Sequence, residues 1–469
     1  MAGNSSVHAS RSQLTSSANP GDQQSIAIPN VQSGLIRRSK CLWAAWGLLI
    51  VLLNGLMVFV VLPKVSPQIR GLYSENRYAD GYDQLAANLA SGNGYRFYPD
   101  TAKTLMREPG YPLLLAGTYE LFGYDFQIVK TLNVALAFGT AFVMILIARR
   151  ISARRLLIFG APLLFLFHPE TLIAESRGGV EIFFGFMLAL FILMVYRAAD
   201  SERWGGYALA GAALGATLLV RSTPLLFPLL LFGYFGFSKR KSANLLVLTR
   251  NFSAMMLTMC LVISPWVIRN YLLTGKFVPT ASVLGVAAQT GLYFSTHHEI
   301  GNVQVDYQAA MERNRLADQF GRPFRPGYYQ YFYSSVDELE FSHYLSSRVA
   351  AEYKAFPLLF LRTLSLNLVK FWCGGKTAKS VVLDGMLQFP FLALAVAGVV
   401  LSVRNGRNKL IAPLVLICIY TIAVSAPILA QARYCEPLIP FMSILSGITL
   451  VSIAQKLVTG RYALSETVF

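Results

Sequence analysis

The chain has 469 residues, of which 54% are hydrophobic and only 14% are charged, and its formal net charge is +17 at pH 7. Soluble domains carry about 25% charged residues, so this composition excludes a water-soluble globular protein. The basic residues lie in short groups between apolar runs and form no compact basic domain, which argues against nucleic-acid binding. Five cysteines without a CxxC pair argue against a zinc module, and we expect Cys373 and Cys435 to be free thiols.

The N-terminal region predicts a tail followed by a first membrane span. Residues 1–36 are rich in Ser, Gln, Asn and Gly, and we expect a disordered cytoplasmic tail there. Residues 42–62 are uncharged and apolar, which matches the roughly 20 helical residues needed to cross a hydrocarbon core. Arg37, Arg38 and Lys40 precede this run, and such basic groups concentrate on the cytoplasmic side of a membrane.

Further apolar runs recur to the end of the chain. They lie near residues 126–148, 156–169, 180–196, 205–220, 223–237, before Ile268, and near 386–403, 410–429 and 437–454. Dense basic turns at 149–155, 197–203, 239–241 and 404–409 then all fall on one side, as the positive-inside bias requires. The pattern therefore predicts an all-α polytopic membrane protein with about ten transmembrane helices.

Two shorter apolar stretches, residues 109–122 and 351–372, are predicted to be helices lying at the outer interface. We accordingly divide the rest of the chain into four parts. These are an N-terminal transmembrane catalytic module at 37–268 with a first outer loop at 63–125, a large outer segment at 269–385, C-terminal transmembrane helices at 386–455 and a cytoplasmic tail at 456–469.

Acidic side chains are scarce, so their positions are informative. Asp80, Asp83 and Glu108 lie in the first outer loop, where an acid beside the membrane surface can remove a proton from an incoming hydroxyl group. The alternative is structural: Asp80 precedes an apolar-periodic stretch and can cap a helix. Glu175 and Glu181 lie in the next outer turn, HPETLIAESRGGVE, and membrane-edge acids of this kind suggest function. Glu181 also opens a helix, where the helix dipole favours an acid.

Cationic and aromatic side chains form two further sets. Arg221, Arg269 and Arg433 fall near the predicted outer boundary, where the topology rule disfavours positive charge, and Arg107 lies in the first outer loop. Guanidinium groups bind phosphate through paired, charge-assisted hydrogen bonds, although snorkelling to the interface explains any one arginine equally well. The aromatic group Tyr328, Tyr329, Tyr331, Phe332 and Tyr333 is suited to stacking on sugars or to packing of the outer segment on itself.

Several stretches together resemble one known family. They are ADGYDQLAANLASGNGY, REPGYPLLLAGTYELFG, KTLNVALAFGTAFVMILIARR, GAALGATLLVRSTPLLFPLLL, SPWVIRNYLLTGKFVP, AFPLLFLRTLSLNLVKFW and RYCEPLIPF. In this order the chain is similar to the polytopic GT-C glycosyltransferases, in particular to bacterial relatives of the protein O-mannosyltransferases and the aminoarabinose transferases. The resemblance implies a helical membrane module with outer interfacial helices and a polyprenyl-phosphate monosaccharide as donor.

The resemblance also implies roles for individual residues. It places an essential acid at Asp80, an acid-proline motif at Glu108 and a second-loop acid at Glu181. The family's usual Asp-x-x-x-Tyr spacing would put the first acid at Tyr78, so Asp80 and Asp83 both stay open as the essential acid.

From these observations we predict an inverting transferase of a bacterial inner membrane with both termini in the cytoplasm. Its partners would be membrane lipids, a polyprenyl-phosphate-linked sugar and an acceptor that is a protein, a lipid or a glycan. No motif requires a metal, and the sequence does not decide whether a divalent cation takes part. The alternatives are a lipid or sugar transporter or flippase, a non-catalytic assembly subunit, and an oligosaccharide-ligase-like transferase.

Overall fold

The computed structural model describes residues 45–65, 79–201, 203–238, 245–297, 305–373 and 378–466, so the expected tail at 1–36 lies outside the described residues. The chain divides into two compact units, Met1–Leu52 and Leu53–Phe469. The described part of the first unit, from Ala45, is helical. Among the described residues of the second unit, the regular structure is helical apart from one antiparallel pair, β1 (Phe324–Arg325) and β2 (Tyr331–Phe332).

Seven helices within the described ranges are long and apolar enough to cross a membrane, which confirms the all-α polytopic fold class. They are Ala45–Val65 with η1 (Met57–Val61) and α2 (Leu62–Val65), α6 (Phe126–Ile151), α9 (Glu181–Ser201), α12 (Leu245–Thr274), Val381–Arg404 of α17 (Ala378–Arg404), α18 (Asn408–Ser425), and Ala432–Leu457. The last contains η4 (Ala432–Tyr434), η5 (Glu436–Leu438) and much of α19 (Ile439–Glu466).

The predicted count of about ten spans is not confirmed. The run near 156–169 becomes α7 (Arg155–Leu166), which with α8 (Pro169–Arg177) forms a pair bent by 51° that counts as an eighth span if taken together. The next two runs give α10 (Trp204–Leu218), η3 (Thr223–Leu226) and α11 (Phe227–Ser238). With 15 residues, α10 is about 22 Å long, which is shorter than the roughly 30 Å hydrocarbon core.

Residues 109–122 form a helix as predicted, α5 (Gly110–Phe122). The prediction of one continuous helix over 351–372 is wrong, because α15 (Ser335–Ala355) ends before Phe356 and α16 (Pro357–Lys370) begins after it. A residue that precedes proline is disfavoured in the helical region, and Phe356 has φ −129° and ψ 76°. The second helix still exposes apolar side chains, with Leu358 80% and Leu361 54% exposed.

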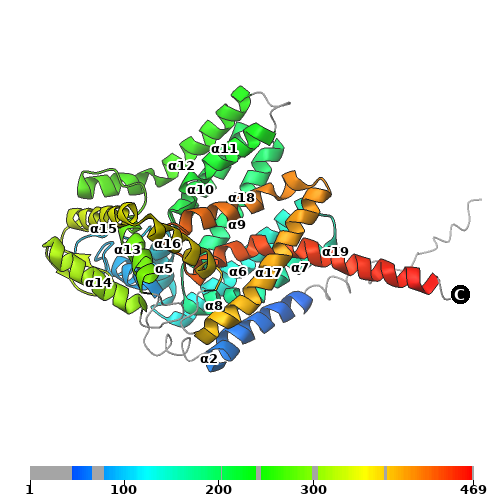
Figure 1. The fold of residues 1–469 in the computed structure, drawn as a ribbon, viewed down its shortest axis with the longest axis horizontal. Coiled ribbons are helices and arrows are strands. Elements are labelled where there is room, and N and C mark those ends of the chain that lie inside the picture. The colour runs from blue at the N-terminus through cyan, green and yellow to red at the C-terminus, as the bar shows by residue number, and fades with distance from the viewer. Residues whose placement is uncertain are drawn as a thin grey trace, which may run out of the picture. The chain divides into compact units, whose positions relative to one another are not determined.

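The first predicted outer loop and the large outer segment share one hydrophobic core. Leu85 of α4 (Tyr82–Ala90) and Phe97 pack in the same cluster as Phe341 and Leu345 of α15. Three helices of the outer segment, α13 (Leu284–Thr296), α14 (Val305–Phe320) and α15, lie side by side (Figure 1). Residues that are far apart in the sequence are therefore held together around the first loop.

The cysteines of the described residues are free thiols, as expected for Cys373 and Cys435. Both of these side chains are buried. The sulfur of Cys435 accepts a hydrogen bond of 3.8 Å from Gln388 Nε2. The described segments are therefore held together without a disulfide between these cysteines.

Candidate active site

The backbone at Asp80 is unusual and sets the direction of its side chain. Within the described residues, Asp80 is the only non-glycine residue with a positive φ, at 70°. It lies in the short turn η2 (Ala79–Gly81), and Gly81 follows with φ 70°, where a Cβ atom would lie 2.7 Å from the Phe97 ring. Aspartate tolerates this left-handed conformation better than most residues, yet the conformation persists only where its surroundings hold it.

The alternative that Asp80 caps α4 is wrong. The N-cap of α4 is Gly81, and no side chain caps that end of the helix. The carboxylate of Asp80 instead accepts hydrogen bonds from Arg433, whose Nη2 lies 3.3 Å from Oδ1, and from the Tyr329 hydroxyl at 3.3 Å. Arg107 Nη2 lies 3.9 Å from the same oxygen. The side chain of Asp80 is 13% exposed, so this carboxylate is largely enclosed by cationic and hydroxyl donors.

These neighbours decide the ionisation of Asp80. Burial raises its pKa, but the positive charges of Arg433 and Arg107 outweigh that effect and hold the pKa well below its usual range. The carboxylate is therefore ionised at neutral pH. A carboxylate with so low a pKa is a weak proton acceptor as long as both arginines stay in place.

Glu181 is the second acid at this point, and its partners join it to the first. It opens α9, and its Oε1 lies 3.5 Å from Arg221 Nη1 and 3.9 Å from Arg433 Nη1. Arg433 therefore lies between the carboxylates of Asp80 and Glu181. The ring of Tyr434 lies beside the Arg221 guanidinium group, 5.0 Å from its central carbon.

The three arginines come from separate parts of the chain and keep some access to solvent. Arg107 belongs to the first predicted outer loop, Arg221 to the turn after α10, and Arg433 to η4. Their side chains are 12%, 21% and 21% exposed. The Nε atom of Arg107 is buried and has no hydrogen-bond partner among the described residues. A guanidinium group offers five donors, so this group of side chains is equipped to bind an oxyanion.

Glu108 has a positioning role. Its Oε1 accepts a hydrogen bond of 2.9 Å from the backbone N–H of Ser222, and the N–H of Gly110 donates to the Leu219 carbonyl at 2.6 Å. These bonds fasten the first loop to the turn that carries Arg221. Glu108 therefore fixes one arginine of the site relative to Asp80.

Three other residues predicted for the site have different partners. Asp83 accepts a hydrogen bond of 3.4 Å from the Tyr124 hydroxyl, and the fully buried Glu175 accepts one of 3.2 Å from Asn54. Arg269 donates to the Thr104 carbonyl at 2.9 Å and lies over the Trp266 ring at 4.4 Å. The geometry thus assembles Asp80, Glu181, Arg107, Arg221 and Arg433, with Glu108 hydrogen-bonded to the backbone beside Arg221.

Two residues at the site have roles that the sequence did not indicate. Tyr329 stacks on Phe97 at 5.8 Å, and its hydroxyl group joins Arg107 to Asp80 by accepting from one and donating to the other. Glu436, one helical turn after Arg433, lies 3.5 Å from Arg177 Nη1. The group of tyrosines at 328–333 could have drawn attention to Tyr329, and the three-residue spacing from Arg433 could have drawn attention to Glu436. Neither signal identifies a partner.

Metal ligation is not indicated within the described parts of the chain, where no group of three or more His, Cys, Asp and Glu side chains could hold an ion. The site's chemistry is that of guanidinium, carboxylate and phenol groups.

No protein-family model and no curated protein matches the chain. It is similar to a crystal structure of ArnT from Cupriavidus metallidurans bound to undecaprenyl phosphate, with a TM-score of 0.40 and 13% identity over 88% of this chain and 79% of that chain. It is also similar to a cryo-EM structure of the arabinosyltransferase EmbB from Mycobacterium smegmatis, with a TM-score of 0.28 and 14% identity over 85% of this chain and 41% of that chain. Neither TM-score reaches 0.5, and the function proposed below rests on the side chains of the site.

Proposed function

We propose that this chain is a membrane glycosyltransferase that moves a monosaccharide from a polyprenyl-phosphate donor to an acceptor hydroxyl group at the outer face of its membrane. One observation carries the proposal. Three arginines from distant segments meet the carboxylates of Asp80 and Glu181 in a partly exposed cluster. The chain also has the apolar helices that an enzyme with a lipid-linked donor needs.

The arginines would bind the donor phosphate. Arg107, Arg221 and Arg433 supply charge-assisted donors that match phosphate oxygens. Glu181 holds the guanidinium group of Arg221 in position, and Asp80 holds that of Arg433. When the sugar leaves, negative charge accumulates on the phosphate. Donors already oriented toward that charge stabilise the transition state without reorganising, and this is commonly the largest electrostatic contribution to catalysis.

The acceptor hydroxyl group would attack the anomeric carbon from the face opposite the phosphate. The bond from that carbon to the phosphate oxygen breaks, the new glycosidic bond forms with inversion, and the acceptor proton passes to Asp80. Donor binding prepares this step, because the phosphate charge offsets the arginines that hold the pKa of Asp80 low. Asp80 therefore becomes a better base only when the donor is present.

The direct test is transfer from a radiolabelled polyprenyl-phosphate sugar in proteoliposomes. We expect Asp80→Asn to reduce transfer about 10²–10⁴-fold, which is the usual contribution of a general base. Asp83→Asn is the matched control, since Asp83 accepts a hydrogen bond from Tyr124 and lies in the same predicted loop. Unchanged turnover of a correctly folded Asp80→Asn protein would rule out the proposed base.

The same proteoliposomes separate the proposal from its alternatives. A transporter or flippase would move labelled lipid across the bilayer without forming a new glycosidic bond, and the buried Glu175–Asn54 pair within apolar helices is the feature that would favour it. An oligosaccharide ligase would transfer a larger glycan, which mass spectrometry of the product detects. Labelling of single cysteines placed in residues 79–108 tests the outer-face location, and cytoplasmic accessibility there would contradict it.

A further inference from the structure

A second polar site lies where the turns at residues 152–154 and 405–407 meet α19. We call it the basic pocket, and its volume is about 150 Å³. It is lined by Ile151, Ser152, Arg154, Leu157, Leu401, Ser402, Asn405, Arg407, Ile448, Val451, Ser452 and Gln455. Both turns are predicted to be cytoplasmic, and their meeting in one pocket agrees with a common side. The helix α9 separates this end from the candidate active site by 21 residues, about 30 Å.

The described residues that line the basic pocket include two arginines and no acid. Arg154 donates a hydrogen bond to the neutral side chain of Gln455. The nearby Arg150 differs, because it pairs with Asp200. Arg154 and Arg407 therefore present positive charge to the pocket, together with the polar side chains of serine and asparagine.

Two helices begin at the basic pocket. Arg154 is the N-cap of α7 and Arg407 is the N-cap of α18, and no side chain caps either helix. The first N–H groups of a helix carry partial positive charge and favour an anion. Their contribution adds to that of the two arginines, so the electrostatics of the pocket favour an anion.

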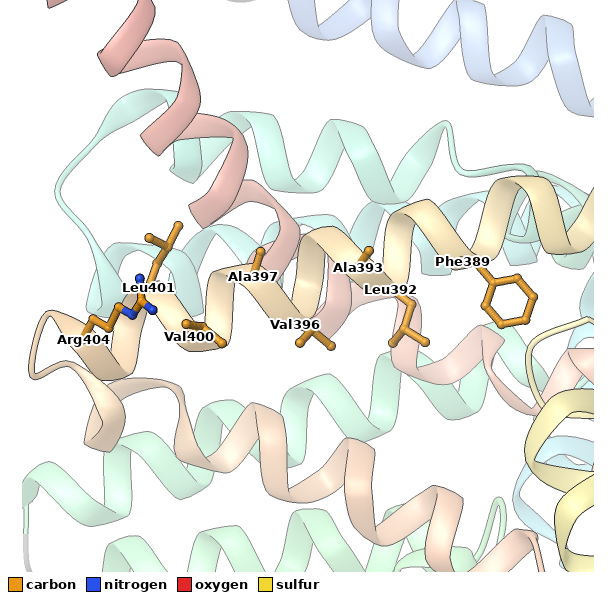
Figure 2. A pocket seen from close by; sticks show the side chains of 8 residues that line it. All are labelled: Phe389, Leu392, Ala393, Val396, Ala397, Val400, Leu401 and Arg404. Atoms are coloured by element: carbon orange, nitrogen blue, oxygen red, sulfur yellow. The ribbon is translucent and has the colours of Figure 1, made fainter.

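A shallow apolar groove runs along one face of α17 and shares Leu401 with the basic pocket. It is lined by Phe389, Leu392, Ala393, Val396, Ala397, Val400, Leu401 and Arg404, which follow one another along the helix in Figure 2. The span from Phe389 to Arg404 is about 22 Å long at 1.5 Å per residue, which exceeds the roughly 15 Å depth of one leaflet's hydrocarbon layer.

We propose that the basic pocket and the groove together bind one anionic phospholipid of the predicted cytoplasmic leaflet. The phosphate would lie between Arg154 and Arg407, and one acyl chain would lie on α17 over Val396 and Val400. The cationic pocket suits the charged headgroup of such a lipid, and the adjoining apolar groove suits its acyl chain. Basic pockets between membrane helices bind anionic headgroups in this way.

The test compares phosphatidylglycerol with phosphatidylcholine on the full-length protein in detergent, with native mass spectrometry to count bound lipid. We expect phosphatidylglycerol to bind more tightly than phosphatidylcholine. Arg154→Gln and Arg407→Gln should each weaken phosphatidylglycerol binding about fivefold, since each basic residue contributes about 1 kcal/mol. Arg203→Gln is the matched control, because Arg203 is exposed on the same predicted side and does not line the pocket.

A second part of the experiment distinguishes binding of a phospholipid from binding of a free anion. Val396→Trp places a bulky ring in the groove, so it should weaken phosphatidylglycerol binding and leave the weak binding of inorganic phosphate unchanged. Equal competition by inorganic phosphate and by phosphatidylglycerol would overturn the lipid assignment. Unchanged lipid binding in the Arg407→Gln and Val396→Trp proteins would overturn the site itself, whether or not Arg154→Gln folds.

Discussion

Asp80 and Glu338 are both enclosed carboxyl groups of the predicted outer region, but their partners differ in charge. Asp80 lies against Arg433 and Arg107. Glu338 lies in the first turn of α15 and accepts hydrogen bonds only from uncharged groups, the Thr104 hydroxyl at 2.7 Å, the Leu105 N–H at 2.8 Å and the Ser282 hydroxyl at 3.0 Å.

The pKa values of the two groups move in opposite directions as a result. Burial acts on both groups to raise the pKa. In Asp80 the arginine charges reverse that effect, whereas in Glu338 the hydrogen bonds from Thr104, Leu105 and Ser282 reduce it without reversing it. The comparison shows that the partners of a buried carboxyl group decide the direction in which its pKa moves. Asp80 is paired with cations at a partly exposed position and belongs to the candidate site, whereas Glu338 is surrounded by neutral donors and joins two segments of the fold.

After Asp80→Asn, the largest effect should follow removal of Arg433, the cation that both acids of the site share. Arg433→Gln is expected to reduce kcat/KM for transfer about 10²–10³-fold, as the loss of a preorganised transition-state donor does. Arg433→Lys should recover only part of this activity, because lysine lacks the planar pair of donors. The control is Arg325→Gln, since Arg325 pairs with Asp100 on an exposed surface. Equal activity of the Gln variant and the native enzyme would contradict the phosphate-binding role.

Changes at Glu338 should affect stability and leave the chemistry in place. Glu338→Gln keeps the shape but sets an amide against hydroxyl donors, and we expect it to lower the free energy of unfolding by about 1–3 kcal/mol. Urea or thermal unfolding in detergent measures this loss. Transfer activity of the folded fraction should be close to normal, and a large loss of kcat without loss of stability would assign Glu338 to the active site instead.

The pH dependence of stability should distinguish the same two residues. Asp80 has a folded-state pKa below 3.8, so its ion pairs stabilise the protein above that pH, and the stabilisation is lost as the pH falls through the folded-state value. Glu338 has a folded-state pKa above 4.5, so stability decreases as the pH rises from 4.5 through that value. In a plot of the free energy of unfolding against pH, Asp80→Asn should reduce the slope below pH 3.8. Glu338→Gln should reduce the slope above pH 4.5. If both variants had the same pH dependence of stability, the opposite pKa shifts of Asp80 and Glu338 would be refuted.

The smallest effect is expected at Tyr329. Tyr329→Phe keeps the stacking on Phe97 and removes the hydroxyl group that donates to Asp80. One hydrogen bond contributes about 0.5–1.5 kcal/mol, so transfer should fall between about twofold and tenfold. Steady-state kinetics can measure this change, with Tyr333→Phe at a half-exposed position as the control.

The local properties of the sequence determined the membrane spans. Helices α6, α9, α12 and α18 lie where long apolar runs predicted them, and α5 lies where a shorter run did. This follows because the length and polarity of a segment decide whether it can be a helix in a membrane. Predictions that depended on how neighbouring segments join were weaker. The break at Phe356 divided an expected interfacial helix, and the bend between α7 and α8 and the short α10 changed the expected number of spans.

In the candidate site, the sequence indicated which residues could take part, and the tertiary structure decided which of them meet. Residue type and position near a membrane boundary selected Asp80, Asp83, Glu181 and the arginines, but the sequence left Asp83 open as a competitor of Asp80. Only the tertiary structure paired Asp80 with Arg433, which lies 353 residues away along the chain. The left-handed backbone at Asp80 and the packing of the last span direct those two side chains toward each other. Contacts at such separations depend on how the helices pack, and no local preference of the chain encodes them.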